Sequence, residues 1–292
     1  MSEHVDVPRY VAGAREGRID KGVCLVRCLN PNGHNFDGTN TWIIGEPNWD
    51  GCVVIDPSQD VAGHFDRVLE IATRQGRRIV AVLITHRHRD HVGDLADFVQ
   101  RAGNPVVYAP AAPEAELADP GSVWPGEVSF VAVTPGPLPI EGFKAPTEVV
   151  SLKGHSADQV GYVFPSLRAA ATGDTVFAHS STALCWPGGT LGDYFASLRL
   201  LGTVVSQGKA QMLLPGHGDV ICNPTEVLER ARRNKRKRLD QVVASVMAGM
   251  PATAEAVVDA LYNDVGENLR DVALTSANAQ LQYAFETGLL QR

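Results

Sequence analysis

The stretch that most constrains the fold is residues 79–95, where an apolar strand runs directly into a cluster of histidines. Its first six residues are β-branched or otherwise apolar, which is typical of a strand buried on both faces. The next seven read Thr-His-Arg-His-Arg-Asp-His. A histidine-rich surface loop is the plain alternative. The chain has only 9 histidines in 292 residues, however, so three within six positions is improbable by chance. We therefore predict a metal site that the preceding strand holds in a fixed geometry.

The spacing within this loop predicts two sets of ligands. His86 and His88 are two residues apart, so in extended backbone their side chains project to the same side. Asp90 and His91 follow where the chain turns toward a predicted helix, and we expect them to point elsewhere. One short loop can thus serve two neighbouring metal ions.

Three further candidates follow, each at the end of a predicted strand and next to a glycine. They are His155 in Gly-His-Ser, Asp174 in Gly-Asp-Thr and His217 in Pro-Gly-His-Gly. Each alone is an ordinary strand-end polar residue. Glycine lets the backbone approach an ion closely, so the recurrence of strand, glycine and ligand favours one shared site.

The motif His-x-His-x-Asp-His, followed in order by a histidine, an aspartate and a histidine, resembles the metallo-β-lactamase superfamily over roughly residues 20–222. The resemblance implies an α/β fold, the αββα sandwich. It also implies that Asp174 bridges two ions and that Asp56, at the end of a predicted strand, supports the histidine loop. The implied ligands are His86, His88 and His155 for one ion and Asp90, His91 and His217 for the other.

Imidazole and carboxylate donors suit two Zn²⁺ per chain, with Mn²⁺ or Fe²⁺ as alternatives. Two such ions hold a bridging hydroxide that attacks an electrophilic carbonyl or phosphoryl centre. We expect Asp90 to orient this hydroxide and to act as general base.

The aspartate at position 174 distinguishes branches of the superfamily. Cysteine-bearing zinc β-lactamases have a thiolate there, and Cys222 follows His217, on the wrong side of the order. We therefore expect β-lactamase activity to be at most a side activity. The bridging aspartate resembles glyoxalase II and RNase Z. The stretch Gly-Thr-Asn-Thr at 38–41 and the C-terminal extension resemble the β-lactamase-like protein 2 group more closely.

The C-terminal extension defines a predicted second domain. We assign residues 1–223 to the catalytic domain and 224–292 to a small helical, winged-helix-like domain without its β wing. A long helix is predicted over 224–248, with seven basic and three acidic residues between 225 and 240. Lys235 interrupts its apolar stripe, which could aim the ammonium at the cleft. The basic residues are either a solvated helix face or a surface for a phosphate-bearing substrate.

Composition narrows the function classes. The net charge of −7 gives no global argument for a nucleic-acid partner, and 44% hydrophobic residues suit a globular protein. Five scattered cysteines form no disulfide framework, and no apolar run is long enough to span a membrane. We expect a cytoplasmic protein, with a homodimer as one role for the C-terminal helices. His34 and His179 are predicted on loops near the metal site. His179 could contact a substrate, although its pattern is more typical of a surface histidine.

Three functions remain open from the sequence. The preferred one is a dinuclear metal-dependent hydrolase of single-stranded RNA or another phosphodiester. The first alternative is hydrolysis of a small thioester or ester at the same site. The second is a non-catalytic metal-binding protein with a DNA-binding tail, although a structural zinc needs only four ligands and no open position.

Overall fold

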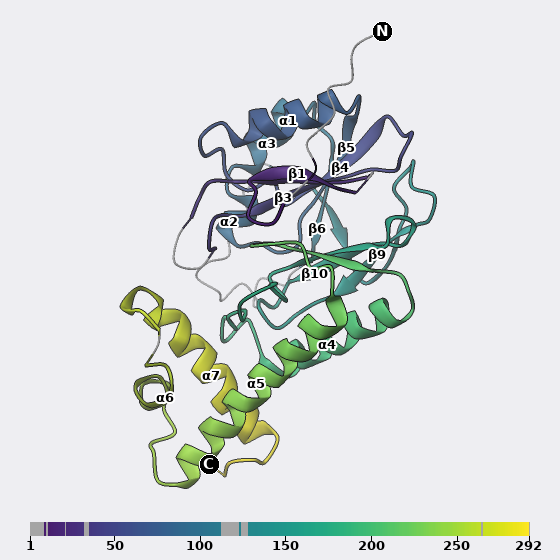
Figure 1. Cartoon of the computed structure of the whole chain (residues 1–292). Helices are drawn as coiled ribbons and strands as arrows, with labels where there is room; N and C mark the ends of the chain where they lie inside the picture. The colour runs from purple at the N-terminus through teal and green to yellow at the C-terminus, as the bar shows by residue number, and fades with distance from the viewer. Residues whose placement is uncertain are drawn as a thin grey trace.

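The computed structural model describes residues 9, 11–20, 22–31, 35–111, 123, 128–263 and 265–291. Two β-sheets face each other, and helices cover the outer face of each (Figure 1). This is the predicted αββα sandwich.

The first sheet has seven strands in the order in which they occur along the chain. The first four pair antiparallel and the last four pair parallel, so β4 belongs to both sets. The strands are β1 (Glu16–Asp20), β2 (Val23–Arg27), β3 (Asn40–Ile44), β4 (Gly51–Ile55), β5 (Arg78–Leu83), β6 (Val106–Pro110) and β7 (Val131–Val133). The strand predicted before the histidine loop is thus β5, in the parallel part of this sheet.

The second sheet has five strands in the order β12-β11-β10-β9-β8. Only the β11–β12 pair is parallel. The strands are β8 (Gly136–Leu138), β9 (Thr147–Ser151), β10 (Val160–Phe164), β11 (Ala169–Gly173) and β12 (Met212–Pro215), with a 3₁₀ turn at Pro165–Leu167. The carboxyl ends of the parallel strands β11 and β12 lie side by side, which brings together the two strand-end motifs that carry Asp174 and His217.

Three apolar clusters hold the layers together. One packs the first sheet against α1 (His64–Arg74) and α3 (Leu95–Arg101), which follows the short helix α2 (Arg89–Val92). A second fills the space between the two sheets. The third packs the outer face of the second sheet against α4 (Leu191–Ser206) and the C-terminal helices. Helix α1 forms where Phe65, Val68 and Ala72 recur at helical spacing, and all three are buried.

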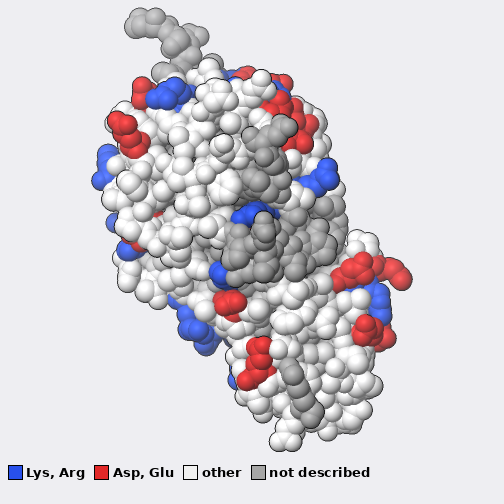
Figure 2. All heavy atoms as spheres, turned by 180° about the vertical axis from the view of Figure 1, so that it is seen from behind, with Lys and Arg blue, Asp and Glu red and all other residues white. Residues whose placement is uncertain are grey.

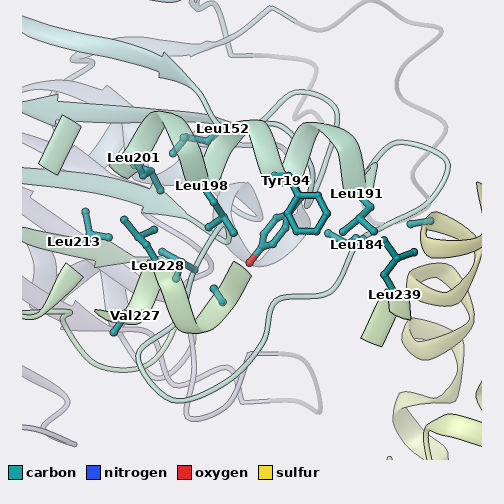
Figure 3. Close-up of a cluster of buried hydrophobic side chains, with 14 of the residues drawn as sticks. Leu152, Leu184, Leu191, Tyr194, Leu198, Leu201, Leu213, Val227, Leu228 and Leu239 are labelled. Carbon is teal, nitrogen blue, oxygen red and sulfur yellow. The ribbon is translucent and has the colours of Figure 1, made fainter. Parts of the chain in front are cut away.

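The C-terminal helices are α5 (Pro224–Met247), α6 (Ala254–Leu261), a 3₁₀ turn at Glu267–Leu269 and α7 (Arg270–Glu286). Thr253 caps α6, and its hydroxyl accepts a hydrogen bond from the Ala256 N–H at 3.3 Å. Figure 3 shows the third cluster running from Leu152 and Leu201 beneath the second sheet to Leu239 on α5. Because the same cluster continues into α7, the helices after residue 223 share a core with the sandwich. The division into two domains stays a prediction.

Two short strands were not predicted. β1 and β8 have partly exposed side chains and no alternating apolar pattern, so periodicity does not reveal them. Among the described residues, no helix is both long and apolar enough to cross a bilayer.

Candidate metal centre

The histidine loop begins where β5 ends, and its first two histidines meet a third from the other sheet. His88 Nδ1 lies 3.0 Å from His86 Nε2 and 2.9 Å from His155 Nε2. His155 sits in the turn between β9 and β10. The three imidazoles therefore converge on one point, in the combination predicted for the first ion.

The second group forms because the chain turns into α2 after His88. This turn carries Asp90 and His91 toward His217 after β12, while the His91 ring stays next to the His86 ring, with 4.2 Å between the centroids. His217 Nε2 lies 3.2 Å from Asp90 Oδ2, and His91 Nε2 lies 3.7 Å from the same oxygen. These are the three residues predicted for the second ion.

Asp174, at the end of β11, reaches both groups. Its Oδ2 lies 3.1 Å from His217 Nε2 and 3.7 Å from His155 Nε2, while its Oδ1 lies 3.5 Å from His91 Nε2. Gly216 permits this approach, because a Cβ there would overlap Asp174 Oδ1 and lie 2.7 Å from His91 Cε1. The carboxylate is thus placed as a bridge between the two groups.

Asp56 orients one histidine of each group. Its Oδ1 accepts a hydrogen bond from the Thr85 N–H at 2.8 Å, and its Oδ2 lies 2.7 Å from Thr85 Oγ1 and 3.0 Å from His91 Nδ1. A carboxylate only accepts, so both of these groups donate to it. The Thr85 hydroxyl then has no proton left for His86 Nδ1 at 3.0 Å, and that nitrogen must donate to it. In both rings Nε2 is therefore the nitrogen directed at the site.

Two further rings, those of His155 and His217, are fixed by backbone carbonyls. His155 Nδ1 donates to Ala183 O at 2.9 Å, and His217 Nδ1 donates to Gly38 O at 3.1 Å. Four of the five histidines therefore present Nε2 to the centre, and His88 presents Nδ1. Such outer hydrogen bonds are typical of metal-ligating histidines.

The Gly-Thr-Asn-Thr stretch connects the two halves of the site. Asn40 donates to Pro215 O at 3.0 Å and Gly218 O at 2.8 Å, on either side of His217. Thr41 Oγ1 donates to Asp56 O at 2.7 Å. This segment thus holds the His217 loop against the first sheet.

The donor atoms fit divalent ions. His91 Nε2 and Asp174 Oδ1 are buried and have no hydrogen-bond partner among the described residues. The lone pairs of the first group face one another at 2.9–3.0 Å, which is unfavourable unless a cation or a proton lies between them. Bonds of about 2.0–2.1 Å to a tetrahedral zinc would place two nitrogens roughly 3.3 Å apart, close to this spacing.

The two groups differ in charge when no ion is bound. Burial and the neighbouring imidazoles lower the pKa of His86, and burial with His88 lowers the pKa of His155 to about 4. Burial opposes the charge on His217, but Asp174 and Asp90 outweigh it and raise the pKa to about 9. The pKa of Asp90 stays below its usual range because His91 and His217 outweigh the effect of burial. His86 and His155 are thus neutral at pH 7, while His217 holds a proton that a metal must displace.

A cavity of about 790 Å³ opens from the metal centre toward the C-terminal helices. Its metal end is formed by His88, Asp90, His155, Asp174 and His217. Its far wall is formed by Tyr262, Val265, Leu269, Val272 and Ala273. A polar reaction centre therefore adjoins a mainly apolar chamber, which is typical of a site for a small organic substrate.

The structure brings all seven predicted ligands together, whereas the other two described histidines, His64 and His179, are not part of this group. His179 is exposed, with Nε2 3.5 Å from Asp219 Oδ2. His64 is buried on α1 against Thr41 Oγ1 at 2.8 Å, and burial lowers its pKa to about 3. His34 lies outside the described residues. Lys235 lines the cavity, as the break in its apolar stripe suggested.

Some residues that line the cavity were not predicted from the sequence. Phe36 and Phe177 stack edge to face at 5.3 Å between ring centroids and flank His217 at 6.2 and 5.7 Å. An isolated aromatic residue in a turn-rich loop was the one available signal for Phe36. Thr182 and Tyr262 carried no signal, because their loops reach the site through tertiary packing.

Comparison with known proteins identifies relatives of this chain and structures with the same fold. An atrochrysone carboxyl ACP thioesterase of Aspergillus chevalieri is 28% identical over 269 residues, covering 88% of this chain and 78% of that protein. A thioesterase of Emericella nidulans is 30% identical over 219 residues, covering 73% of this chain and 56% of that protein. A β-lactamase domain protein from Burkholderia ambifaria has the same fold, with a TM-score of 0.73 at 19% identity over 97% of this chain and 93% of that one.

The family model described as the metallo-beta-lactamase superfamily matches residues 34–217, a span that begins before the histidine loop and ends at its last partner, His217. The match covers more than half of the chain, and the fold implies divalent metal binding. The protein is therefore a hydrolase that belongs to the metallo-β-lactamase superfamily.

Proposed function

We propose that this protein hydrolyses an acyl thioester with two divalent metal ions, preferably zinc. The observation that carries the proposal is the cavity, in which five of the seven candidate ligands face a mainly apolar chamber suited to an acyl group. The thioesterase names of the two curated relatives support the same substrate class.

The RNA substrate that we preferred from the sequence has weaker support. Of the basic residues on α5, Lys235, Lys237 and Arg238 line the cavity, whereas Arg232 and Arg236 are exposed and do not line it. Arg236 instead faces Asp240 at 3.5 Å on the same helix. On the face shown in Figure 2, basic residues are scattered among acidic ones and form no continuous stripe. The basic residues of α5 are thus divided between the cavity and the surface, and they do not form the single phosphate-binding surface that we expected.

The non-catalytic alternative is set aside for a different reason. The family and the thioesterase-named relatives indicate a hydrolase. The candidate ligand set is also larger than a structural zinc requires, and it opens into a cavity.

The residues of the chain define how the reaction proceeds. When bound, the two ions polarise the thioester carbonyl and lower the pKa of an attacking water. His86, His88 and His155 would hold one ion, His91, His217 and Asp90 the other, and Asp174 both. Asp90 is half-buried at the cavity wall with an ionised carboxylate, so it can orient the water and accept its proton. Attack on the carbonyl carbon breaks the C–S bond and yields a carboxylic acid and a thiol.

A substrate panel with zinc-reconstituted protein tests the proposal. It contains an acyl N-acetylcysteamine thioester, lactoylglutathione, single-stranded RNA, a phosphodiester dye and a chromogenic β-lactam, each with Asp90→Asn as control. We expect a thioester to be hydrolysed fastest, with loss of that rate in the variant. Hydrolysis of RNA while every thioester is untouched would overturn the proposal.

A further inference from the structure

Lys235 is a buried cation that the proposed metal chemistry does not use. Its side chain lies on α5 and lines the same cavity as the metal ligands, yet the residue is only 7% exposed. A lysine is almost never this buried unless it is paired. Its surroundings therefore bear on what the cavity binds.

The protein leaves this ammonium incompletely satisfied. Nζ donates to Thr182 O at 2.6 Å and lies 5.6 Å from the centroid of the Tyr194 ring. An ammonium has three N–H donors, and one of them has a hydrogen-bond acceptor here. No carboxylate among the described residues lies within 4.0 Å of it. The groups around the charge are thus one neutral carbonyl, one ring face, the Cys185 thiol and the Arg238 guanidinium, and none of them is a carboxylate.

This arrangement is costly without a ligand. Burial, with a smaller contribution from Arg238, lowers the pKa of Lys235 to about 8. An anion in the cavity would restore both the missing countercharge and the missing acceptors. Lys235 remains mostly protonated at pH 7, so it can offer a charge-assisted hydrogen bond.

The position of Lys235 indicates which part of a substrate carries the anion. Thr182, which accepts from Lys235, also donates through Oγ1 to Asp174 O. Only two hydrogen bonds therefore connect the ammonium to the residue placed between the two ions. An anion here lies near the scissile carbonyl. The phosphate of a phosphopantetheine arm is separated from its thioester by the length of the arm, and so does not fit this position.

We propose that Lys235 forms an anion-binding subsite that selects thioesters whose acyl group carries a carboxylate a few bonds from the scissile carbonyl. This inference rests on the proposed thioester hydrolysis and narrows its substrate class. The apolar wall beyond Lys235 contacts the rest of the acyl group.

Binding measurements test the subsite independently of hydrolysis. The probes are amide analogues of malonyl, succinyl and glutaryl N-acetylcysteamine thioesters, each paired with its methyl-ended counterpart. Amides resist hydrolysis, so calorimetry on zinc-loaded protein reports binding alone. We expect the best carboxylate analogue to bind about 10- to 100-fold more tightly than its methyl-ended partner, the scale of one charge-assisted hydrogen bond.

Substitutions assign this preference to one side chain. Lys235→Met keeps the apolar stem and removes the charge, so it should abolish the preference and leave the methyl-ended analogue unaffected. Lys235→Arg should retain part of it. Arg232→Met removes one charge from the exposed side of the same helix and should change neither affinity. An equal preference in the wild type and in Lys235→Met would overturn the proposal.

A measurement on the wild type covers the case in which Lys235→Met does not fold. At pH 8 Lys235 is about half protonated, so binding of the carboxylate analogue should draw in protons. Calorimetry in two buffers of different ionisation enthalpy detects this uptake, and the methyl-ended analogue should show none. Equal uptake with both analogues would count against the subsite.

Two further outcomes are informative. One distinguishes a carboxylate subsite from a phosphate site, and the other separates failure of the subsite from failure of the proposed hydrolysis. If Lys235→Met weakens the binding of an acyl phosphopantetheine but of no carboxylate-bearing acyl analogue, the anion at Lys235 is the phosphate of the arm and the proposal fails. If the carboxylate preference holds but no thioester is hydrolysed, the subsite stands and the proposed function fails.

Discussion

Replacing Asp56 by asparagine should weaken both metal ions, although Asp56 belongs to neither candidate ligand group. The residue is 2% exposed and accepts from the Thr85 N–H, the Thr85 hydroxyl and His91 Nδ1. Through Thr85 it also sets the donor role of His86. His86 lies in the first group and His91 in the second, so one carboxylate orients a ring for each ion.

The size of the effect follows from the acceptors lost. Asparagine has one acceptor oxygen where aspartate has two, so at least one buried donor at Asp56 loses its partner. Such a loss costs about 1–3 kcal/mol of unfolding free energy. Removing an outer partner of a metal ligand lowers metal affinity about 10- to 100-fold. We expect this reduction at both sites, which corresponds to roughly 1.4–2.7 kcal/mol per ion.

Zinc competition with a chromophoric chelator measures both affinities in Asp56→Asn and in the wild type. Asp66→Asn is the control, because it removes a carboxylate that pairs with Arg101 on the surface, away from the histidine loop. The control should bind zinc normally. Wild-type affinity at either site in Asp56→Asn would refute the claim that one carboxylate orients a ring for each ion.

Three further predictions concern the second group. Asp90→Asn should lower the rate of thioester hydrolysis about 10²-fold, which is the scale of losing a general base. A colorimetric assay of the released thiol measures this rate. Normal turnover with full metal content would show that another group takes the proton. Asp174 and Asp90 raise the pKa of His217 to about 9, so zinc binding at pH 7 should release protons, and zinc affinity should rise with pH until about 9. Calorimetry in two buffers of different ionisation enthalpy measures the proton release. Zinc binding without proton release would contradict this prediction. Gly216→Ala should deplete bound metal by elemental analysis, since its Cβ would overlap Asp174, whereas Gly202→Ala has open space and should not.

The sequence predicted those parts of the fold whose pattern is local. Residues 79–84 are apolar without interruption and form most of β5, and the spacing in 224–248 predicted α5 almost to the residue. The short strands β1 and β8 lack such a pattern. Each is held by pairing with the next strand along the chain, and backbone pairing of this kind leaves no periodic apolar signal in the side chains.

The candidate ligands were predictable for a related reason, since each follows a strand end and a recognisable glycine or histidine motif. The cavity was not. Whether Arg232 or Lys235 faces the metals depends on the rotation of α5 against α4 and α7, which only tertiary packing sets. The basic composition of this helix therefore favoured RNA, although only three of its seven basic residues, Lys235, Lys237 and Arg238, line the cavity, and of these only Lys235 is buried.

The most direct test of the central claim is the rate of thioester hydrolysis as metal-free protein is titrated with zinc. Two groups of ligands that share Asp174 should act as one centre. We predict that the rate rises until two equivalents of zinc per chain are bound and then stays constant, with both ions found by elemental analysis. A plateau at one equivalent, or hydrolysis that survives complete removal of metal, would contradict a dinuclear thioester hydrolase.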